Sequence, residues 1–316
     1  MSNETYMGYG VNASDVTESF YQICEDVSLH GLETAPRGMK VKELLDYSVV
    51  VSNPRARIVQ SKARKTPLRY LLAEWIWYLS GQNHIDSIVD YAPFWATIAS
   101  EKGTVNSNYG YRIFGMSPDV PYNQWEKVKS ILKHDPDSRQ AIMHINAGYD
   151  YVNSSKDVPC TIALQWFIRE NKLHLAVSMR SNDVVLGYTS DFFQFTMLQE
   201  MMMVQLKREC FPNLQLGGYM HKAGSMHVYE RHFEMLADIE KEVLPTKTIS
   251  MKPMQLKDSD IANLISFEKE WRTKHESSKE VEAEMTSTSA YQQLSPYWQN
   301  LIKYHFFGGD VSLISE

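Results

Sequence analysis

The chain has 316 residues, of which 43% are hydrophobic and 22% charged, and its formal net charge is −6. This is the composition of an ordinary globular protein, and it excludes a chain that is disordered throughout. The acidic balance argues against a protein that coats nucleic acid, because such proteins usually carry a basic excess. A protein that binds one nucleotide needs only a few local arginines, so that class stays open.

The three cysteines, Cys24, Cys160 and Cys210, cannot form a fully paired disulfide framework, and their spacing fits no zinc motif. We therefore expect a reducing compartment and no bound metal. The N-terminal residues lack a basic segment followed by an apolar one, and no run of about 18 apolar residues occurs. These features predict a cytoplasmic protein without a membrane partner.

Apolar periodicity predicts the helices and strands in chain order. The segment 68–80 is apolar almost all round, carries Glu74 in its middle and is followed by Gly81, so a buried helix is expected there. Further helices are expected at 16–29, 124–133, 192–206 and 227–242, and strands within 39–59 and at 140–145, 161–169 and 172–179.

Strands and long helices are interspersed without regular βαβ alternation, which favours an α+β fold. We expect one catalytic domain over residues 1–316, with a divergent C-terminal segment from about 246. Within that segment, the charged pattern at 257–282 predicts a helix with a solvated face, and the aromatic run at 297–302 is expected to dock on the core.

Two segments carry candidate chemistry. Cys160 follows a proline just before a predicted strand, where a cysteine is by itself more often a small hydrophobe than a nucleophile. The segment 180–187 (RSNDVVLG) follows a strand and precedes a helix. Its arginine, serine and backbone amides could hold a phosphate, and an arginine beside a cysteine favours the thiolate.

Further motifs occur together with these two segments. Pro159-Cys160 and 180–187 are followed by Gly224-x-x-His227-x-Tyr229-x-x-His232, and they are preceded by Glu74, Trp95, Tyr109-Gly110 and the segment 135–139. In order and spacing, this set resembles the thymidylate synthase family over roughly residues 40–242. The resemblance implies that family's fold, a mixed β-sheet covered by long helices, and a soluble one-carbon transferase.

The resemblance also implies catalytic roles. Cys160 is similar to the nucleophile that adds to C6 of a pyrimidine nucleotide, which lets C5 attack the methylene carbon of the co-substrate 5,10-methylenetetrahydrofolate. Glu74 resembles the general acid–base, and Tyr109 resembles the tyrosine near the C5 proton.

Binding roles follow in the same way. The family's phosphate ligands correspond to Arg37, Arg139, Arg180 and Ser181, its sugar-hydroxyl pair to His227 and Tyr229, and its folate site to Trp95, Asp183 and Gly187. The family's counterpart of Arg139 reaches the phosphate of a neighbouring subunit, which implies a symmetric homodimer packed sheet against sheet.

Asp191 is the main departure from the family, which carries asparagine there to pair with N3–H and O4 of uracil. Cytosine presents the opposite pattern, because its N3 accepts and its 4-amino group donates. When a carboxyl group and cytosine share one proton, that proton lies between the carboxyl group and N3, and the other carboxyl oxygen accepts from the 4-amino group. Asp191 therefore predicts a cytosine substrate. This combination is similar to the deoxycytidylate hydroxymethylases of bacteriophages, in which water captures the methylene intermediate; for a phage protein, the cytoplasm would be that of the host.

Four alternatives stay open. The chain could be a dCMP C5-methyltransferase, a CMP hydroxymethylase, or a thymidylate synthase specific for dUMP. It could also be a non-catalytic nucleotide- or RNA-binding homologue, although Glu74, Cys160 and Asp183 together argue against this class.

Overall fold

The computed structural model describes residues 6–115, 122–151, 156–274 and 278–316. The chain forms two compact units, each built from three stretches. The first unit comprises Met1–Thr66, Ile131–Ile142 and Cys160–Ser250, and the second Pro67–Ser130, Met143–Pro159 and Met251–Glu316. Among the described residues, no helix combines the length and the apolar character that crossing a membrane requires.

A mixed β-sheet forms the centre of the first unit. Its strands lie in the order β1 (Gly10–Ala13), β3 (Val41–Val51), β8 (Gln215–Tyr229), β6 (Lys172–Met179) and β5 (Thr161–Arg169). β3 and β8 are antiparallel, β8 and β6 are parallel, and β6 and β5 are antiparallel. The short strands β2 (Leu32–Thr34) and β7 (Asn182–Asp183) pair with β3 and β8. The predicted mixed sheet is therefore confirmed.

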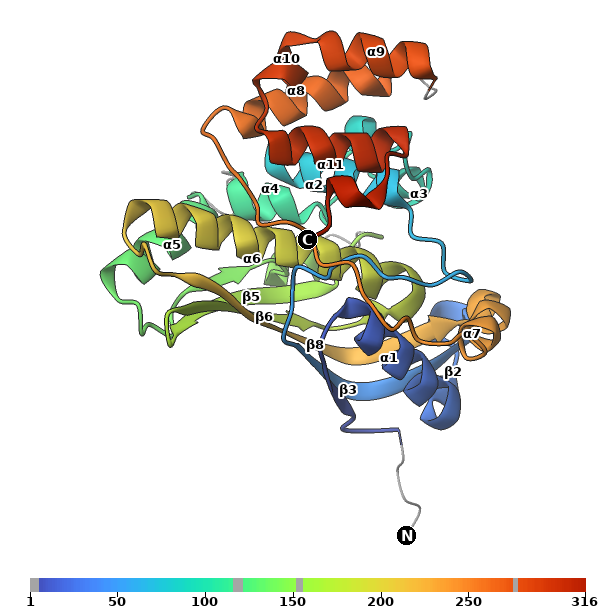
Figure 1. The fold of residues 1–316 in the computed structure, drawn as a ribbon. Helices are drawn as coiled ribbons and strands as arrows, with labels where there is room; N and C mark the ends of the chain where they lie inside the picture. The colour runs from blue at the N-terminus through green and yellow to red at the C-terminus, as the bar shows by residue number, and fades with distance from the viewer. Residues whose placement is uncertain (1–5, 116–121, 152–155, 275–277) are drawn as a thin grey trace. The chain divides into compact units, whose positions relative to one another are not determined.

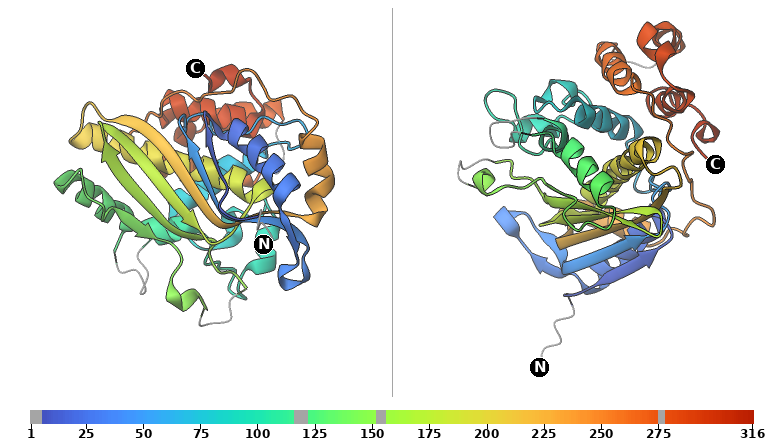
Figure 2. Two further views of the ribbon diagram at one scale, coloured as in Figure 1. Left: turned by 90° about the horizontal axis from the view of Figure 1, so that it is seen from below. Right: turned by 90° about the vertical axis from the view of Figure 1, so that its left-hand side faces the viewer.

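Two long helices of the first unit cover one face of this sheet (Figure 1): α1 (Val16–His30) packs on β1 and β3, and α6 (Thr189–Glu209) packs on β6 and β8. The carboxylate of Glu200 on α6 is fully buried and pairs with Arg55 and Arg57, each at 2.6 Å. Among the described residues of this unit, no helix covers the opposite face of the sheet (Figure 2).

Helices dominate the second unit. α2 (Leu68–Ser80) has the predicted bounds, and Gly81 ends it in the left-handed conformation, with φ 62°. α11 (Pro296–Phe307) packs on α2 and buries Trp298, Leu301 and Ile302, so the predicted docking of the aromatic run is confirmed. The remaining helices of this unit are α3 (Phe94–Ile98), α4 (Tyr109–Phe114), α8 (Asp260–Arg272), α9 (Lys279–Ser287) and α10 (Ser289–Gln293).

Two elements, α5 (Gln124–His134) and β4 (Ile142–His144), have residues in both units, and both fall where the sequence predicts them. The charged segment 257–282 is helical over α8 and α9, and its residues 275–277 lie outside the described ranges. α8 has a solvated face, which includes Ser266, Lys269 and Glu270, and its other face buries Leu264, Phe267 and Trp271.

The helix predicted at 227–242 is wrong in its bounds. Residues 227–229 end the strand β8, which pairs with both β3 and β6, and only the short helix α7 (Phe233–Ile239) follows. Met226, His227 and Val228 are all buried, so the alternation that normally marks a strand is lost there.

Candidate active site

Cys160 and Arg180 lie together at one end of the sheet in the first unit. The backbone N–H of Arg180 donates to the carbonyl of Cys160 at 2.9 Å, where β6 ends and β5 is about to begin. Cys160 is half-buried and Arg180 is exposed, and this bond makes their backbones adjacent. Ser181, half-buried, comes next along the chain.

Gly224 allows β8 to approach this end of β6. A Cβ atom on Gly224 would lie 2.8 Å from the carbonyl oxygen of Arg180, which is closer than Cβ contacts occur. The same oxygen accepts from the backbone N–H of Ser225 at 3.2 Å. The glycine of the family motif therefore has a structural role here, because it lets two strands meet beside Arg180.

His227 and Tyr229 lie at the end of β8 and form a pair. Their rings are 5.0 Å apart between centroids and meet edge to face. Burial lowers the pKa of His227, so its imidazole is neutral near pH 7 and offers one donor and one acceptor. A sugar hydroxyl, itself both donor and acceptor, fits such a group.

Asp183 lies beside His227, because β7 pairs with β8 in a register that sets these two residues opposite each other. Its carboxylate accepts from the backbone N–H of Val185 at 3.0 Å. Burial raises the pKa of Asp183 to about 6, although the positive charges of Arg231 and Arg64 act in the opposite direction. The group can therefore change its charge within the physiological pH range.

Arg231 was missed by the sequence reasoning. Its guanidinium lies 4.4 Å from the ring centroid of Tyr229. Burial and the charge of Asp183 raise the pKa of Tyr229, while the charges of Arg37 and Arg231 lower it. Arg37 is thus close enough to Tyr229 to affect it electrostatically. The signal in the sequence was an arginine two residues after Tyr229.

Arg37 and Arg139 are both exposed. Arg37 occupies a tight turn with φ 53°, a left-handed conformation that few residues other than glycine adopt. The carbonyl of Arg139 accepts from the side chain of Gln165 on β5 at 2.9 Å, which ties the backbone of Arg139 to the sheet.

Asp191 lies half-buried in the first turn of α6. Its Oδ2 accepts a hydrogen bond from Nδ2 of Asn182 on β7 at 2.7 Å. Gly187 belongs to the π-helical turn Val184–Tyr188, and a Cβ atom there would lie 3.0 Å from Nδ2 of Asn182. The sequence reasoning gave Asn182 no role, since it occupies a variable position of the family motif.

Three predicted site residues belong to the second unit, and all three are buried. Glu74 on α2 accepts from the hydroxyl of Tyr70 at 2.6 Å. Tyr109 begins α4, with its ring 5.7 Å from that of Tyr78, and Trp95 on α3 packs edge-on against Trp77 at 5.0 Å.

Asp157, also missed by the sequence reasoning, organises a loop of the second unit. Its carboxylate accepts from the backbone N–H groups of Asn106 at 2.6 Å and Ser107 at 2.8 Å. This connects the segment that leads to Cys160, three residues later, with the loop that leads into Tyr109.

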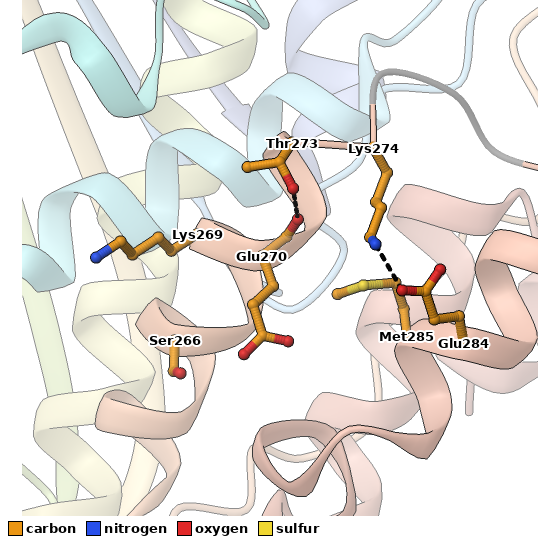
Figure 3. A pocket seen from close by; sticks show the side chains of 7 residues that line it. All are labelled: Ser266, Lys269, Glu270, Thr273, Lys274, Glu284 and Met285. Carbon is orange, nitrogen blue, oxygen red and sulfur yellow. Dashed lines mark hydrogen bonds and ion pairs between the residues drawn. The ribbon is translucent and has the colours of Figure 1, made fainter.

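A pocket of about 470 Å³ lies in the second unit, between α8 and α9 (Figure 3). Its lining is mainly charged and polar, and Lys274 and Glu284 form an ion pair there at 2.5 Å. None of the predicted site residues lines it. Within the described parts of the chain, no group of three or more potential metal ligands occurs.

Comparisons with known proteins show the family of this chain. The family described as thymidylate synthase matches residues 18–285. A deoxyuridylate hydroxymethyltransferase of Bacillus phage SP01 is 30% identical over 245 residues, covering 74% of this chain and 62% of that protein. A deoxycytidylate 5-hydroxymethyltransferase of Enterobacteria phage T4 is 33% identical over 173 residues, covering 53% of this chain and 69% of that protein.

Solved structures show the same fold. A thermostable thymidylate synthase A from Bacillus subtilis superposes with a TM-score of 0.63 at 23% identity, covering 80% of this chain and 91% of that one.

Proposed function

Because this chain belongs to the thymidylate synthase family of one-carbon transferases, whose co-substrate is 5,10-methylenetetrahydrofolate, we propose that it converts dCMP to 5-hydroxymethyl-dCMP. The observation that carries this proposal is the carboxylate of Asp191, held by Asn182 where the family places an asparagine. The similarity to a deoxycytidylate 5-hydroxymethyltransferase supports it. In this proposal the two units act as one catalytic domain in the cytoplasm.

Cys160 is the proposed nucleophile. Its thiolate adds to C6 of cytosine, the C5–C6 electron pair moves to C5, and C5 bonds to the methylene carbon of the folate. Loss of the C5 proton and departure of tetrahydrofolate, which keeps a proton on its nitrogen, leave an exocyclic methylene. Water adds to that carbon, and the S–C6 bond breaks to restore the ring and the thiolate.

The other site residues bind and move protons in this proposal. Glu74 is the acid–base group and Tyr109 assists removal of the C5 proton. Arg37, Arg139, Arg180 and Ser181 bind phosphate, His227 and Tyr229 bind the 3′-hydroxyl, and Trp95, Asp183 and Gly187 line the folate site. The exposure of Arg180, whose backbone is hydrogen-bonded to that of Cys160, supports its part in phosphate binding.

A homodimer is part of the proposal, with the uncovered face of the sheet as its interface. Val50, Met220 and Ala176 are neighbours in register across β3, β8 and β6 on this face, and Val50 is 42% exposed. An apolar row across three strands is suited to packing against a second copy. Sedimentation equilibrium tests this assembly.

A second candidate substrate is dUMP, because the relative from phage SP01 is described as acting on deoxyuridylate. Asp191 favours dCMP over dUMP, since an ionised carboxylate offers no donor to O4 of uracil.

Tritium release from C5-labelled dCMP in the presence of methylenetetrahydrofolate tests the proposal. We expect release by the wild type, none by Cys160→Ala, and wild-type release by Cys210→Ala, which removes an exposed thiol. Equal release by the Cys160 variant would refute the assignment of the nucleophile.

A further inference from the structure

Asn182 is an almost completely buried amide, 3% exposed, in the short strand β7. Pairing of β7 with β8 fixes its backbone, since Asn182 is in register with Met226. Its Nδ2 donates to Oδ2 of Asp191 at 2.7 Å, and the missing side chain of Gly187 leaves room for this amide. The contact is therefore built within the stretch 182–191, and the separate strand β8 fixes one end of it.

The direction of this hydrogen bond has a chemical consequence. An amide nitrogen can only donate, so Oδ2 of Asp191 must accept. A donor to a carboxylate favours its ionised form over its protonated form. If the amide were reversed, its oxygen would face Asp191, and that arrangement requires a proton on the carboxyl group.

The oxygen of the same amide supports a role that involves a ligand. Oδ1 of Asn182 is buried and has no hydrogen-bond partner among the described residues. Buried polar atoms are almost always paired, and exceptions often mark a place where water or a ligand supplies the partner. The amide therefore donates to Asp191 through its nitrogen, while its oxygen has room for a partner from water or a ligand.

We propose that Asn182 is a positioning residue for Asp191, which it holds as an oriented carboxylate and thereby biases the enzyme against uracil. This inference rests on the proposed function, in which Asp191 recognises the base.

One proton between the base and Asp191 sets this bias. With cytosine, N3 of the base and Asp191 share a proton, and a donor to the carboxylate shifts this proton towards N3. A ring protonated at N3 is more electrophilic at C6, where Cys160 adds. With uracil, O4 needs a donor, and an ionised carboxylate has none.

A protonated Asp191 would behave differently. Its O–H would donate to O4 of uracil, and its other oxygen would accept from N3–H, as an asparagine amide does. Loss of Asn182 therefore makes the uracil-accepting form of Asp191 more accessible, above all at low pH.

The test compares kcat/KM for dCMP and dUMP between pH 5.5 and 8.5. Asn182→Ala removes the amide without added bulk, and Asn182→Leu keeps the branching at Cγ without its hydrogen bonds. Either variant that melts cooperatively suffices. We expect the dCMP:dUMP ratio to fall about tenfold, the size of one charge-assisted hydrogen bond. We also expect dUMP turnover relative to dCMP to rise as pH falls in the variant, more steeply than in the wild type. Asn53→Ala, which removes an exposed amide of the same unit, is the matched control.

The Asp191→Asn background separates the two hypotheses. In that background Asn182→Ala should leave the pH dependence of the ratio unchanged, because no carboxylate is left to protonate. If Asp191→Asn by itself leaves the ratio unchanged, the proposed function fails and this inference fails with it. If Asp191→Asn changes the ratio but Asn182→Ala changes neither the ratio nor its pH dependence, only the role of Asn182 is refuted. An equal loss on both substrates at every pH would also refute it.

Discussion

Asp191→Asn is expected to shift substrate preference from dCMP towards dUMP. The substitution keeps the size of a half-buried side chain whose Oδ2 accepts from Asn182 at 2.7 Å. Because Asn182 presents a donor, the new amide must turn its oxygen to Asn182 and its nitrogen to the base. That nitrogen donates to O4 of uracil and opposes the 4-amino group of cytosine.

The expected magnitude follows from one mispaired buried group. Such a group costs about 1–3 kcal/mol, which corresponds to a change of about 5- to 150-fold in the ratio of kcat/KM values. Competition of dCMP against dUMP in one reaction measures this ratio directly. Asp238→Asn removes the same charge from an exposed position on α7 of the first unit and should change nothing. An unchanged ratio in the Asp191 variant would refute base recognition by this residue.

Two further predictions concern the rest of the site. Burial raises the pKa of Asp183 to about 6, so this carboxylate gains a proton and loses acceptor capacity as pH falls through that value. We expect KM for methylenetetrahydrofolate to rise as pH falls from 7 to 5.5. Asp183→Asn should remove this pH dependence of KM. A titration of KM near pH 6 that persists in the variant would contradict the assignment of Asp183 to the folate site. Gly110→Ala should lower the free energy of unfolding by about 1–3 kcal/mol. The new Cβ would lie 2.0 Å from the carbonyl oxygen of Tyr78, so α2 and α4 would have to separate. Urea unfolding measures this free energy. Gly148→Ala is the control, because its new Cβ would meet no atom within 4 Å. An equal loss of unfolding free energy in both variants would contradict the reasoning.

Much of the fold could be predicted from the sequence where one pattern dominates. The helix α2 and the strands β5 and β6 have the predicted bounds, because the first is apolar all round and the strands are bounded by clear breaks. The end of β8 was mistaken for a helix because tertiary burial on both faces removes its alternation. The spacing of apolar residues in β8 carries no information on which strands will pair with it on its two sides.

Some residues of the candidate site could be predicted from the sequence and others could not. Cys160, Asp183 and His227 could be proposed because their residue types and spacing match a known family. Asn182 and Arg231 could not, since their contacts depend on the turns that follow β7 and β8. Contacts of this kind join segments that no sequence period relates.

The mass of the product formed from dCMP and methylenetetrahydrofolate tests the central claim most directly. We predict a gain of CH2O together with release of tetrahydrofolate, as water capture requires. A gain of CH2 with release of dihydrofolate would contradict this account and identify hydride as the last reactant.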